Sequence, residues 1–529
     1  MKNNENGSSL LTVLLMLLIF TVLGLVLLSV TIQGSKRTEY RETEVKEEIE
    51  HMTSLKEAVA QIKNFVDEHN DQLSSKTTED AVLGDFLKQM NDAHSDSYTI
   101  TDVSKQPQYN VGESQTRVLL AKSKKDAFEQ LVYITAMPSF MKYAVGSQSN
   151  LFINGAASID GDIYAKNKLF VSQEANYVYN SEKLSVATGL PSLSAASTIF
   201  LEDNASSRYR FCASSCYQVN EKTDLPFQLQ TSHWQDKSKA IRAFSPDKTP
   251  VINKDPFVDL KLKQSFLDKL SLAGVDLSGL SEDSSKEEIS RRLSEEISNY
   301  PDNNKITSFT EIEKKGPGNY FYEGYTSENG PDAFIDTDSL NIGRDHWLII
   351  NGNAKFSNDI TINGNVLVTG DIYFEGSHTI DSVMYALGKA TFTDTDIRNP
   401  ATVDPSQPTG FIMMAMEGLQ LAIYDKFASS SKNNTINGFL YTDSSADIYG
   451  VGSLVRVNGS IFAKQNLSIN AYQGEASGEK ERISFTPSSL ETASRLKVKN
   501  NKRLFIGKSN ALPKVTKFDV ITDNIIKNN

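Results

Sequence analysis

The stretch from His346 to Thr393 reads HWLIIN-GNAKFS-NDITIN-GNVLVT-GDIYFE-GSHTID-SVMYAL-GKATFT when it is divided every six residues. The third and fifth residues of these units are mostly apolar. Because successive side chains of a strand point to opposite faces, these two positions share one face. Gly or Asn opens six of the eight units, and both residue types tolerate the positive φ of a sharp corner. The stretch therefore predicts short strands joined by regularly spaced corners.

The same phase recurs in two other places. Residues 149–172 read SNLFIN-GAASID-GDIYAK-NKLFVS, and residues 447–470 read DIYGVG-SLVRVN-GSIFAK-QNLSIN. An antiparallel sheet can also alternate, but it would not keep one six-residue phase over eight units. The pattern favours a parallel β-solenoid with three strands, or about 18 residues, in each coil. The predicted class is mainly β with helical parts.

The remaining ranges divide around these three solenoid segments. We expect long insertions at 173–345 and 394–446, a small α/β cap over 71–148 and a C-terminal cap over 471–529. Caps are needed because an open solenoid end exposes unpaired strand edges. The larger insertion contains two helical patterns, and the smaller one contains the apolar run FIMMAM at 411–416, which favours a buried strand.

The N-terminal segment is apolar over an unusual length. No charged residue occurs from Asn6 to Ser35, and Leu10 to Val30 is almost continuously apolar. This run exceeds the roughly 20 residues that cross a bilayer, and it is longer than the apolar run of a cleavable secretory signal. The sequence therefore predicts a transmembrane helix over 8–35. Apolar residues at spacings of three and four predict an amphipathic stalk helix over 36–70, packed on a neighbour's helix or on its own downstream domain.

The residues Glu5 to Leu15, ENGSSLLTVLL, resemble the start of type IV pilin-like proteins, and in particular the PilX kind of minor pilin. The resemblance implies a leader over 1–7 that a prepilin-type leader peptidase cuts between Gly7 and Ser8. It also implies that the apolar helix packs with other pilin-like subunits in a filament core. Thr12 stands where major pilins carry Glu, which suits a minor subunit. An uncleaved signal anchor is the alternative.

Charge does not settle the orientation. Lys36, Arg37 and Arg41 follow the apolar run, whereas Lys2 and the free amine precede it, so the positive-inside rule favours a cytoplasmic body. The pilin resemblance implies the opposite, and we follow it. The expected location is the cell membrane, with a single pass through the lipid bilayer and an extracellular body.

The hexads also resemble those of bactofilins, which are polymer-forming bacterial cytoskeletal proteins with an apolar β-helix. The resemblance rests on two apolar residues per unit, whereas hexapeptide acyltransferases have one dominant aliphatic position. It implies a structural protein, although a fold does not fix a function.

Motifs for catalysis are not found: G-x-S-x-G, H-E-x-x-H, Walker A and G-x-G-x-x-G are absent in usable context. His378 takes an inward hexad position, where a core histidine is favoured over a catalytic one. Asp336 and Asp338 favour a polar turn over a calcium loop. We therefore expect no catalytic, cofactor-binding or metal residues. The net charge of −12 argues against nucleic acid as a partner.

Cys212 and Cys216 are the two cysteines of the chain. Three states stay open from the sequence. A disulfide would suit a body outside the cell, and free thiols would suit a cytoplasmic one. A zinc site would need two ligands besides the pair, and His233 supplies at most one of them.

Together these observations predict a membrane-anchored, pilin-like structural protein, either a minor pilin or a pilus-assembly factor, that presents a rigid β-solenoid. The alternatives are a membrane-tethered, bactofilin-like scaffold and a surface-binding module or adhesin that uses the 173–345 insertion.

Overall fold

The computed structural model describes most of the chain, and all statements below concern those residues. They are 6–73, 79–106, 116–124, 127–135, 138–179, 182–202, 208–218, 227–236, 242–252, 257, 259–323, 333–335, 337–357, 359–401, 409–421, 433–479, 482–501, 511–513, 515, 518–523 and 525–528. The chain forms two compact units. The first comprises residues 1–102, 119–132 and 522–529, and the second comprises 103–118 and 133–521.

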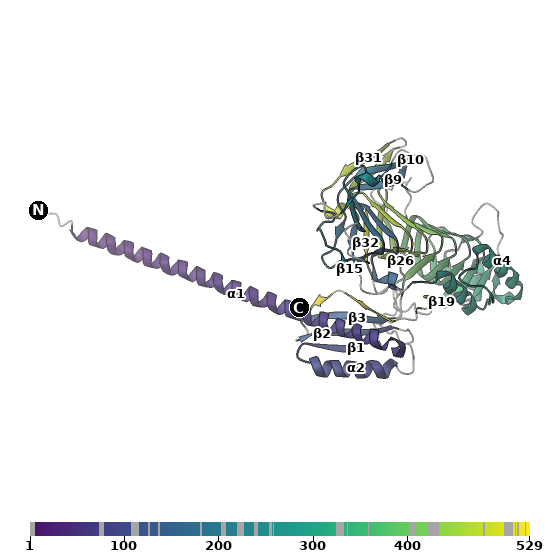
Figure 1. Ribbon diagram of the computed structural model, residues 1–529, viewed down its shortest axis with the longest axis horizontal. Helices are drawn as coiled ribbons and strands as arrows, with labels where there is room; N and C mark the ends of the chain where they lie inside the picture. Colours follow the sequence, from purple (N-terminus) through teal and green to yellow (C-terminus); the bar gives the residue numbers. More distant parts are fainter. Residues whose placement is uncertain are drawn as a thin grey trace. The chain divides into compact units, whose positions relative to one another are not determined.

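The first unit is built on one long helix, α1 (Asn6–Leu73), which Figure 1 shows and which has a kink at His69. A second helix, α2 (Glu79–His94), accompanies it. The small sheet has the strand order β1–β2–β3–β33, with β34 paired to β3. These strands are β1 (Tyr98–Asp102), β2 (Thr116–Ser123), β3 (Phe128–Thr135), β33 (Asp519–Thr522) and β34 (Ile526–Lys527).

The C-terminal part of α1 packs within this unit. Leu55, Ile62 and Val66 are fully or almost fully buried, and their spacing of seven and four residues places them on one helix face. The Phe65 ring stacks on that of Phe86 in α2 with centroids 4.0 Å apart. The stalk helix was expected to pack either on a neighbour's helix or on its own downstream domain. For Leu55, Ile62 and Val66, the structure shows packing on the chain's own domain.

The predicted transmembrane helix over 8–35 requires correction. Within the described residues, no helix combines the length and the apolar character that a bilayer crossing demands. The apolar residues are not a separate element. They form the first part of the 68-residue α1, which continues unbroken into a segment rich in Glu, Lys and Arg. The transmembrane part of the predicted fold class is therefore wrong, and the single-pass anchoring that depended on it loses its structural basis.

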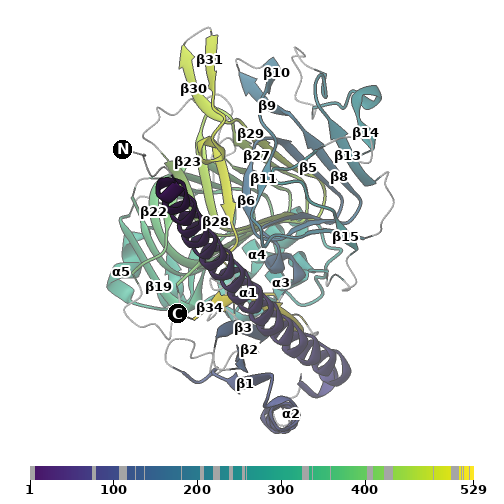
Figure 2. The same cartoon turned by 90° about the vertical axis from the view of Figure 1, so that its left-hand side faces the viewer.

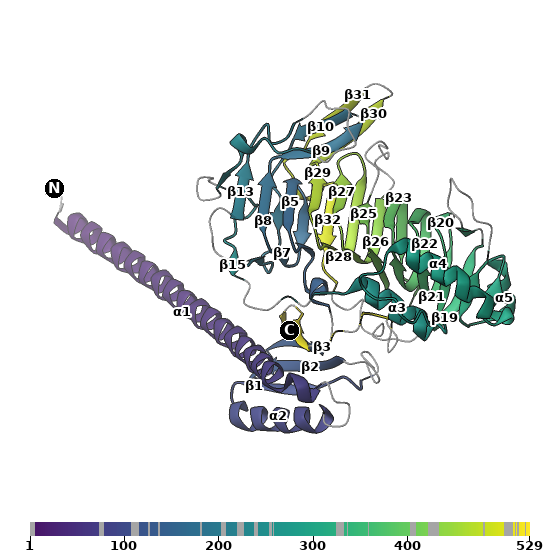
Figure 3. The same cartoon turned by 45° about the vertical axis from the view of Figure 1, so that its right-hand side comes forward.

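The second unit is β-rich, and its strands stack in parallel coils. Ala354 pairs with Ile372, and Ile372 pairs with Ala390, so each step along the stack advances the chain by 18 residues. Three faces make up each coil. Figure 3 shows strands of the first face side by side. In sequence order they are β5 (Asn150–Gly155), β8 (Lys168–Ser172), β13 (Tyr209–Cys212), β18 (Ala333–Ile335), β20 (Ala354–Ser357), β25 (Gly418–Leu421), β27 (Ala446–Gly450) and β29 (Leu467–Ala471).

The other two faces have shorter strands of their own, and six long strands turn at least one corner between faces. The second face has β4 (Val145–Ser147), β7 (Ile163–Ala165), β12 (Ile199–Leu201), β15 (Val251–Ile252), β16 (Lys305–Ile306), β17 (Tyr320–Tyr322) and β24 (Phe411–Ala415). The third has β6 (Ser158–Asp160), β11 (Ser192–Leu193) and β32 (Leu496–Lys499). The long strands are β19 (Ser339–Ile350), β21 (Thr361–Val368), β22 (Ile372–Ala386), β23 (Lys389–Arg398), β26 (Asn433–Thr442) and β28 (Leu454–Ala463). Of these, β22 and β23 begin on the first face, where they pair with β20 and β25.

The interior of the coils is a set of apolar ladders. Phe374 lies between Phe356 and Phe392, with ring centroids 4.9 and 5.0 Å away. Ile372 and Phe374 are buried, whereas Tyr373 between them is half-buried and donates its hydroxyl proton to Asp371 at 3.0 Å. This alternation is what positions three and five of the hexads predict.

The spatial order of the coils differs from their order in the chain. Strands β28 and β29 pair with β4 and β5, so residues 454–471 lie beside residues 145–155. The similar hexads GDIYAK-NKLFVS and GSIFAK-QNLSIN lie two coils apart, because residues 145–155 form the coil between them. From β13 the chain passes through the 213–304 region to the other end of the stack, where β16 to β19 form the first coils of the run that ends at β29. The range 173–345 thus contributes strands to both ends.

The outer side of the second face is aromatic and covered. Leu367, Tyr385, Met414, Tyr441 and Phe462 lie in one row on neighbouring strands, Tyr164 follows beyond Gly146 of β4, and each of these six side chains is at most 1% exposed. The rings of Phe140 and Phe257 cover part of this row, at 4.5 Å from Tyr441 and 5.3 Å from Phe462. Because strand β24 (Phe411–Ala415) is buried on both sides, it is apolar at every position.

The helices of the second unit lie in the 257–315 region. They are α3 (Leu262–Leu272), α4 (Lys286–Glu296) and α5 (Thr310–Lys315). Short 3₁₀ turns lie both there and elsewhere in the unit: η2 (Ser139–Lys142), η4 (Thr231–His233), η6 (Ile297–Asn299), η7 (Asp302–Asn304) and η8 (Glu491–Ala493). Ser285 caps the N-terminus of α4, because its hydroxyl accepts the Glu288 N–H. Lys286, the first residue of the helix, forms an ion pair with Glu417.

Two antiparallel hairpins extend from the stack, as Figure 2 shows. They are β9 (Glu174–Tyr179) with β10 (Glu182–Ala187), and β30 (Gly474–Glu479) with β31 (Arg482–Pro487). The Tyr177 and Phe485 rings meet edge to face between them, at 5.6 Å. A two-residue strand, β14 (Gln235–Asp236), pairs antiparallel with β13.

Candidate functional site

The N-terminal part of α1 presents apolar side chains to solvent on all sides. Those that the structure describes are between 48% and 71% exposed: Val13, Leu14, Leu15, Met16, Leu17, Leu18, Ile19, Phe20, Val22, Leu23, Leu25 and Leu28. An α-helix that is apolar around its whole circumference is normally buried on all sides. We call these residues the apolar segment of α1. It is the most extensive exposed apolar surface among the described residues.

The apolar segment belongs to a helix that is held elsewhere. Downstream of it, Tyr40, Val45 and Ile49 are also exposed, and burial begins only near Leu55. The Nζ atom of Lys527 forms an ion pair with Glu48 at the edge of the packed part. One end of α1 is therefore fixed in the first unit, and the other end is free to contact other molecules.

The predicted cleavage residues lie at the start of this helix. Gly7 and Ser8 fall within the bounds of α1, which begins at Asn6. Their side chains and residues 1–5 lie outside what the structure describes. Cleavage between Gly7 and Ser8 therefore stays a prediction.

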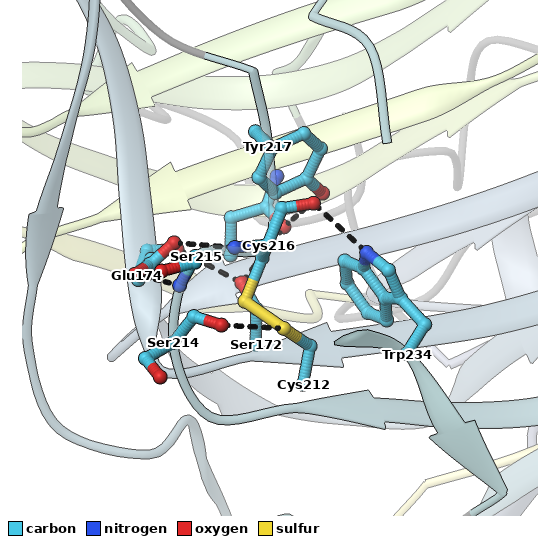
Figure 4. Close-up of a disulfide and its surroundings, with 9 residues drawn as sticks. Ser172, Glu174, Cys212, Ser214, Ser215, Cys216, Tyr217 and Trp234 are labelled. Carbon is cyan, nitrogen blue, oxygen red and sulfur yellow. Dashed lines mark hydrogen bonds between the residues drawn. A yellow bond between two sulfur atoms is a disulfide. The ribbon is translucent and has the colours of Figure 1, made fainter. Parts of the chain in front are cut away.

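Cys212 and Cys216 are joined in a disulfide, which Figure 4 shows with its surroundings. Both residues are at most 1% exposed. The Glu174 carboxylate accepts hydrogen bonds from the backbone N–H groups of Ser215 and Cys216, at 2.6 and 2.9 Å. Trp234 donates its indole N–H to the Cys216 carbonyl at 3.0 Å. The loop is thus held by a covalent bond, a buried carboxylate and an aromatic ring, which is a structural arrangement.

A polar ladder connects this loop to the coils, and the sequence analysis missed it. Tyr217 donates to Asn154 Oδ1 at 2.6 Å, Ser172 donates to the same atom at 3.1 Å, and Asn154 donates to Asn470 at 3.0 Å. Burial raises the pKa of Tyr217 well above its usual value, so the phenol stays protonated and keeps donating. The signal was available, because Asn154, Ser172 and Asn470 all close their hexads.

His378 lies inside the coils and is 1% exposed. Its ring meets that of Phe374 edge to face at 5.8 Å. Burial lowers the pKa of His378 to about 4, so the imidazole is neutral near pH 7. A neutral ring sealed in an apolar interior cannot reach a substrate in solution.

The other candidates do not assemble into a metal site. Both sulfurs of the cysteine pair are bonded to each other, and His233 lies in η4. Asp338 directly precedes β19, and Asp336 lies outside the described residues. Among the residues described, no group of three His, Cys, Asp or Glu side chains could hold a metal ion.

Comparison with known proteins adds little. The sequence matches no protein-family model. No curated protein sequence is similar to it. Among solved structures, the chain is similar to the competence-associated pilin ComZ from Thermus thermophilus, with 10% sequence identity over 81% of this chain and 84% of that one. The TM-score is 0.25, which is too low to establish a shared fold.

Proposed function

We propose that this chain is a pilin-like structural subunit whose apolar segment packs against the helices of other pilin-like subunits. The observation that carries the proposal is the exposed apolar circumference of α1 between Val13 and Leu28, on a helix anchored at its other end. The start of the sequence, which resembles minor pilins of the PilX kind, supports the same role. The proposal assigns no catalysis to the chain.

The energetics favour assembly. Full burial of one Leu, Val or Phe side chain contributes about 1.5–3 kcal/mol relative to leaving it in water. Twelve such side chains are about half exposed or more. Even partial burial against neighbouring helices would exceed the cost of bringing the subunits together, which is several kcal/mol. Several neighbours are needed, because one partner helix covers only one side of a helix that is apolar all round.

The finer assignment is a minor or assembly subunit with its body outside the cell. Thr12 supports the minor role, since it cannot offer the carboxylate that major pilins have at this position. The buried disulfide supports the location, because such bonds form and persist in oxidising compartments. The partners of this proposal are other pilin-like subunits and a prepilin-type leader peptidase.

Site-specific photo-crosslinking in the source cells tests the proposal. A photoreactive residue at Leu18, inside the apolar segment, should crosslink to the apolar N-terminal helix of a pilin-like subunit or of a second copy. The same probe at Tyr40 is the matched control, since Tyr40 lies on the same helix and is 75% exposed but follows the apolar segment. Crosslinking of Leu18 to lipid alone, or equal crosslinking at both positions, would contradict the proposal.

A further inference from the structure

The third face of the stack carries a short basic row on its outer side. Thr435 in β26 pairs with Arg456 in β28, Arg456 pairs with Lys497 in β32, and Lys497 pairs with Ser158 in β6. Neighbouring strands are about 4.8 Å apart, so these four side chains follow one another at that spacing. We call them the basic row. Their neighbours along the strands, Val457 and Val498, are buried in the coils, which fixes the backbone that carries the row.

The two central residues form an unusual pair. Like charges directly opposite each other on adjacent strands are destabilising. Arg456 is exposed, and Lys497 is half-buried. The pKa of Lys497 is lowered, first by burial and then by the positive charge of Arg456. Although the chain has a net charge of −12, no carboxylate among the described residues forms an ion pair with either member.

Other cations of the same face are paired. Arg398 contacts Asp396 at 3.1 Å, and Lys499 lies 4.0 Å from Asp160. In contrast, neither Arg456 nor Lys497 forms an ion pair or a hydrogen bond with any residue that the structure describes. Two adjacent positive charges, with a hydroxyl group on either side, are therefore left to bind something from solution.

We propose that the basic row binds a single phosphate group between Arg456 and Lys497. The planar guanidinium can donate two parallel hydrogen bonds to two phosphate oxygens, and the ammonium can contact a third as a point charge. Thr435 and Ser158 lie one strand further out on either side, so the two charged side chains supply the contacts to the phosphate. A phosphate group would remove the repulsion that the free protein carries at this place.

The surroundings restrict the ligand to one compact anion. Asp396 closes one end of the row, where its carboxylate accepts the Thr435 N–H at 2.8 Å. Asp160 lies two residues beyond Ser158 on β6, at the other end. These carboxylates, together with the net charge of −12, repel an extended polyanion. The phosphate is either free or the terminal group of a larger molecule.

Calorimetric titration of the full-length chain in a phosphate-free buffer tests the site with two ligands. Inorganic phosphate represents the free ion, and glycerol 3-phosphate represents a terminal phosphate group. Binding of both supports a site for phosphate monoesters, and binding of inorganic phosphate alone supports a site for the free ion. The double variant Arg456→Gln/Lys497→Gln should weaken binding by roughly tenfold or more, because it removes the charged donors.

Two further variants keep the test decisive. Arg398→Gln is the matched control, since it removes a positive charge from the same face at a paired position, and it should leave the affinity unchanged. Lys497→Gln alone should raise the thermal midpoint in the absence of phosphate, because the like-charge contact is relieved and the fold is retained. Absence of binding by the unmodified chain, or equal weakening by Arg398→Gln, would overturn the proposal.

Discussion

Truncation of Phe374 to Ala is the most direct way to probe the interior of the coils. The Phe374 ring is 1% exposed and lies between two other rings, with centroid distances of 4.9 and 5.0 Å. Removal of a buried Phe side chain costs about 3–5 kcal/mol, because apolar contacts are lost and a cavity remains. The loss of two aromatic pairs places Phe374→Ala towards the upper end of that range.

The matched control is Tyr373→Ala. Tyr373 has a ring of similar size on the same strand, but it faces outward and is half-buried, with one hydrogen bond to Asp371. We expect a loss of about 1 kcal/mol for this variant. Urea unfolding of both variants, with hydrogen exchange of the β20, β22 and β23 amides, measures the difference. Equal losses of stability would refute the assignment of inner and outer positions.

Three further predictions concern protonation and redox state. The pKa of His378 is lowered from 6.5 to about 4 in the folded protein, so the free energy of unfolding does not depend on this group above pH 6.5 and falls as pH drops from 6.5 towards 4. His378→Leu should remove up to about 3 kcal/mol of this pH dependence, as measured by unfolding between pH 4 and 7. The Glu311 pKa is lowered to about 2, chiefly by hydrogen bonds from backbone N–H groups, so Glu311→Gln should destabilise the chain near pH 7, with the difference shrinking below pH 4.5 and vanishing near pH 2. Thiol labelling of protein denatured without reductant should leave Cys212 and Cys216 unmodified, and quantitative labelling of both in freshly lysed, alkylated cells would favour a cytoplasmic protein.

The hexad pattern predicted local structure well, because each unit carries its own information. The alternation of Ile372, Tyr373 and Phe374 and the corner glycines depend only on neighbours along the chain. Gly364, for example, has φ 121°, a backbone conformation that favours Gly whatever surrounds it. Such constraints are visible in any single unit of the repeat.

The order of the coils was beyond the reach of that pattern. Strand β29 pairs with β5, although Leu467 and Leu151 are more than three hundred residues apart in the chain. Every hexad offers the same apolar ladder to its neighbours, so similarity between two hexads does not reveal which coils touch. Most of the coil strands within 173–345 were missed because they are only two to four residues long. The Arg456–Lys497 pair became visible only once β28 and β32 were known to be neighbours.

The apolar N-terminus shows a different limit. A long apolar helix has the same composition whether lipid or other helices surround it, so the run from Leu10 to Val30 predicted a bilayer span that the described structure does not support. What the structure establishes is where the helix is held, through Leu55, Ile62 and Val66, and where its apolar side chains have no cover.

N-terminal sequencing of the protein purified from its source cells tests the pilin-like account most directly. Gly7 offers no side chain to obstruct a peptidase, and the account predicts a mature chain that begins at Ser8. Gly7→Leu should leave the chain uncut. A native chain that begins at Met1 or Lys2 would contradict the pilin-like assignment.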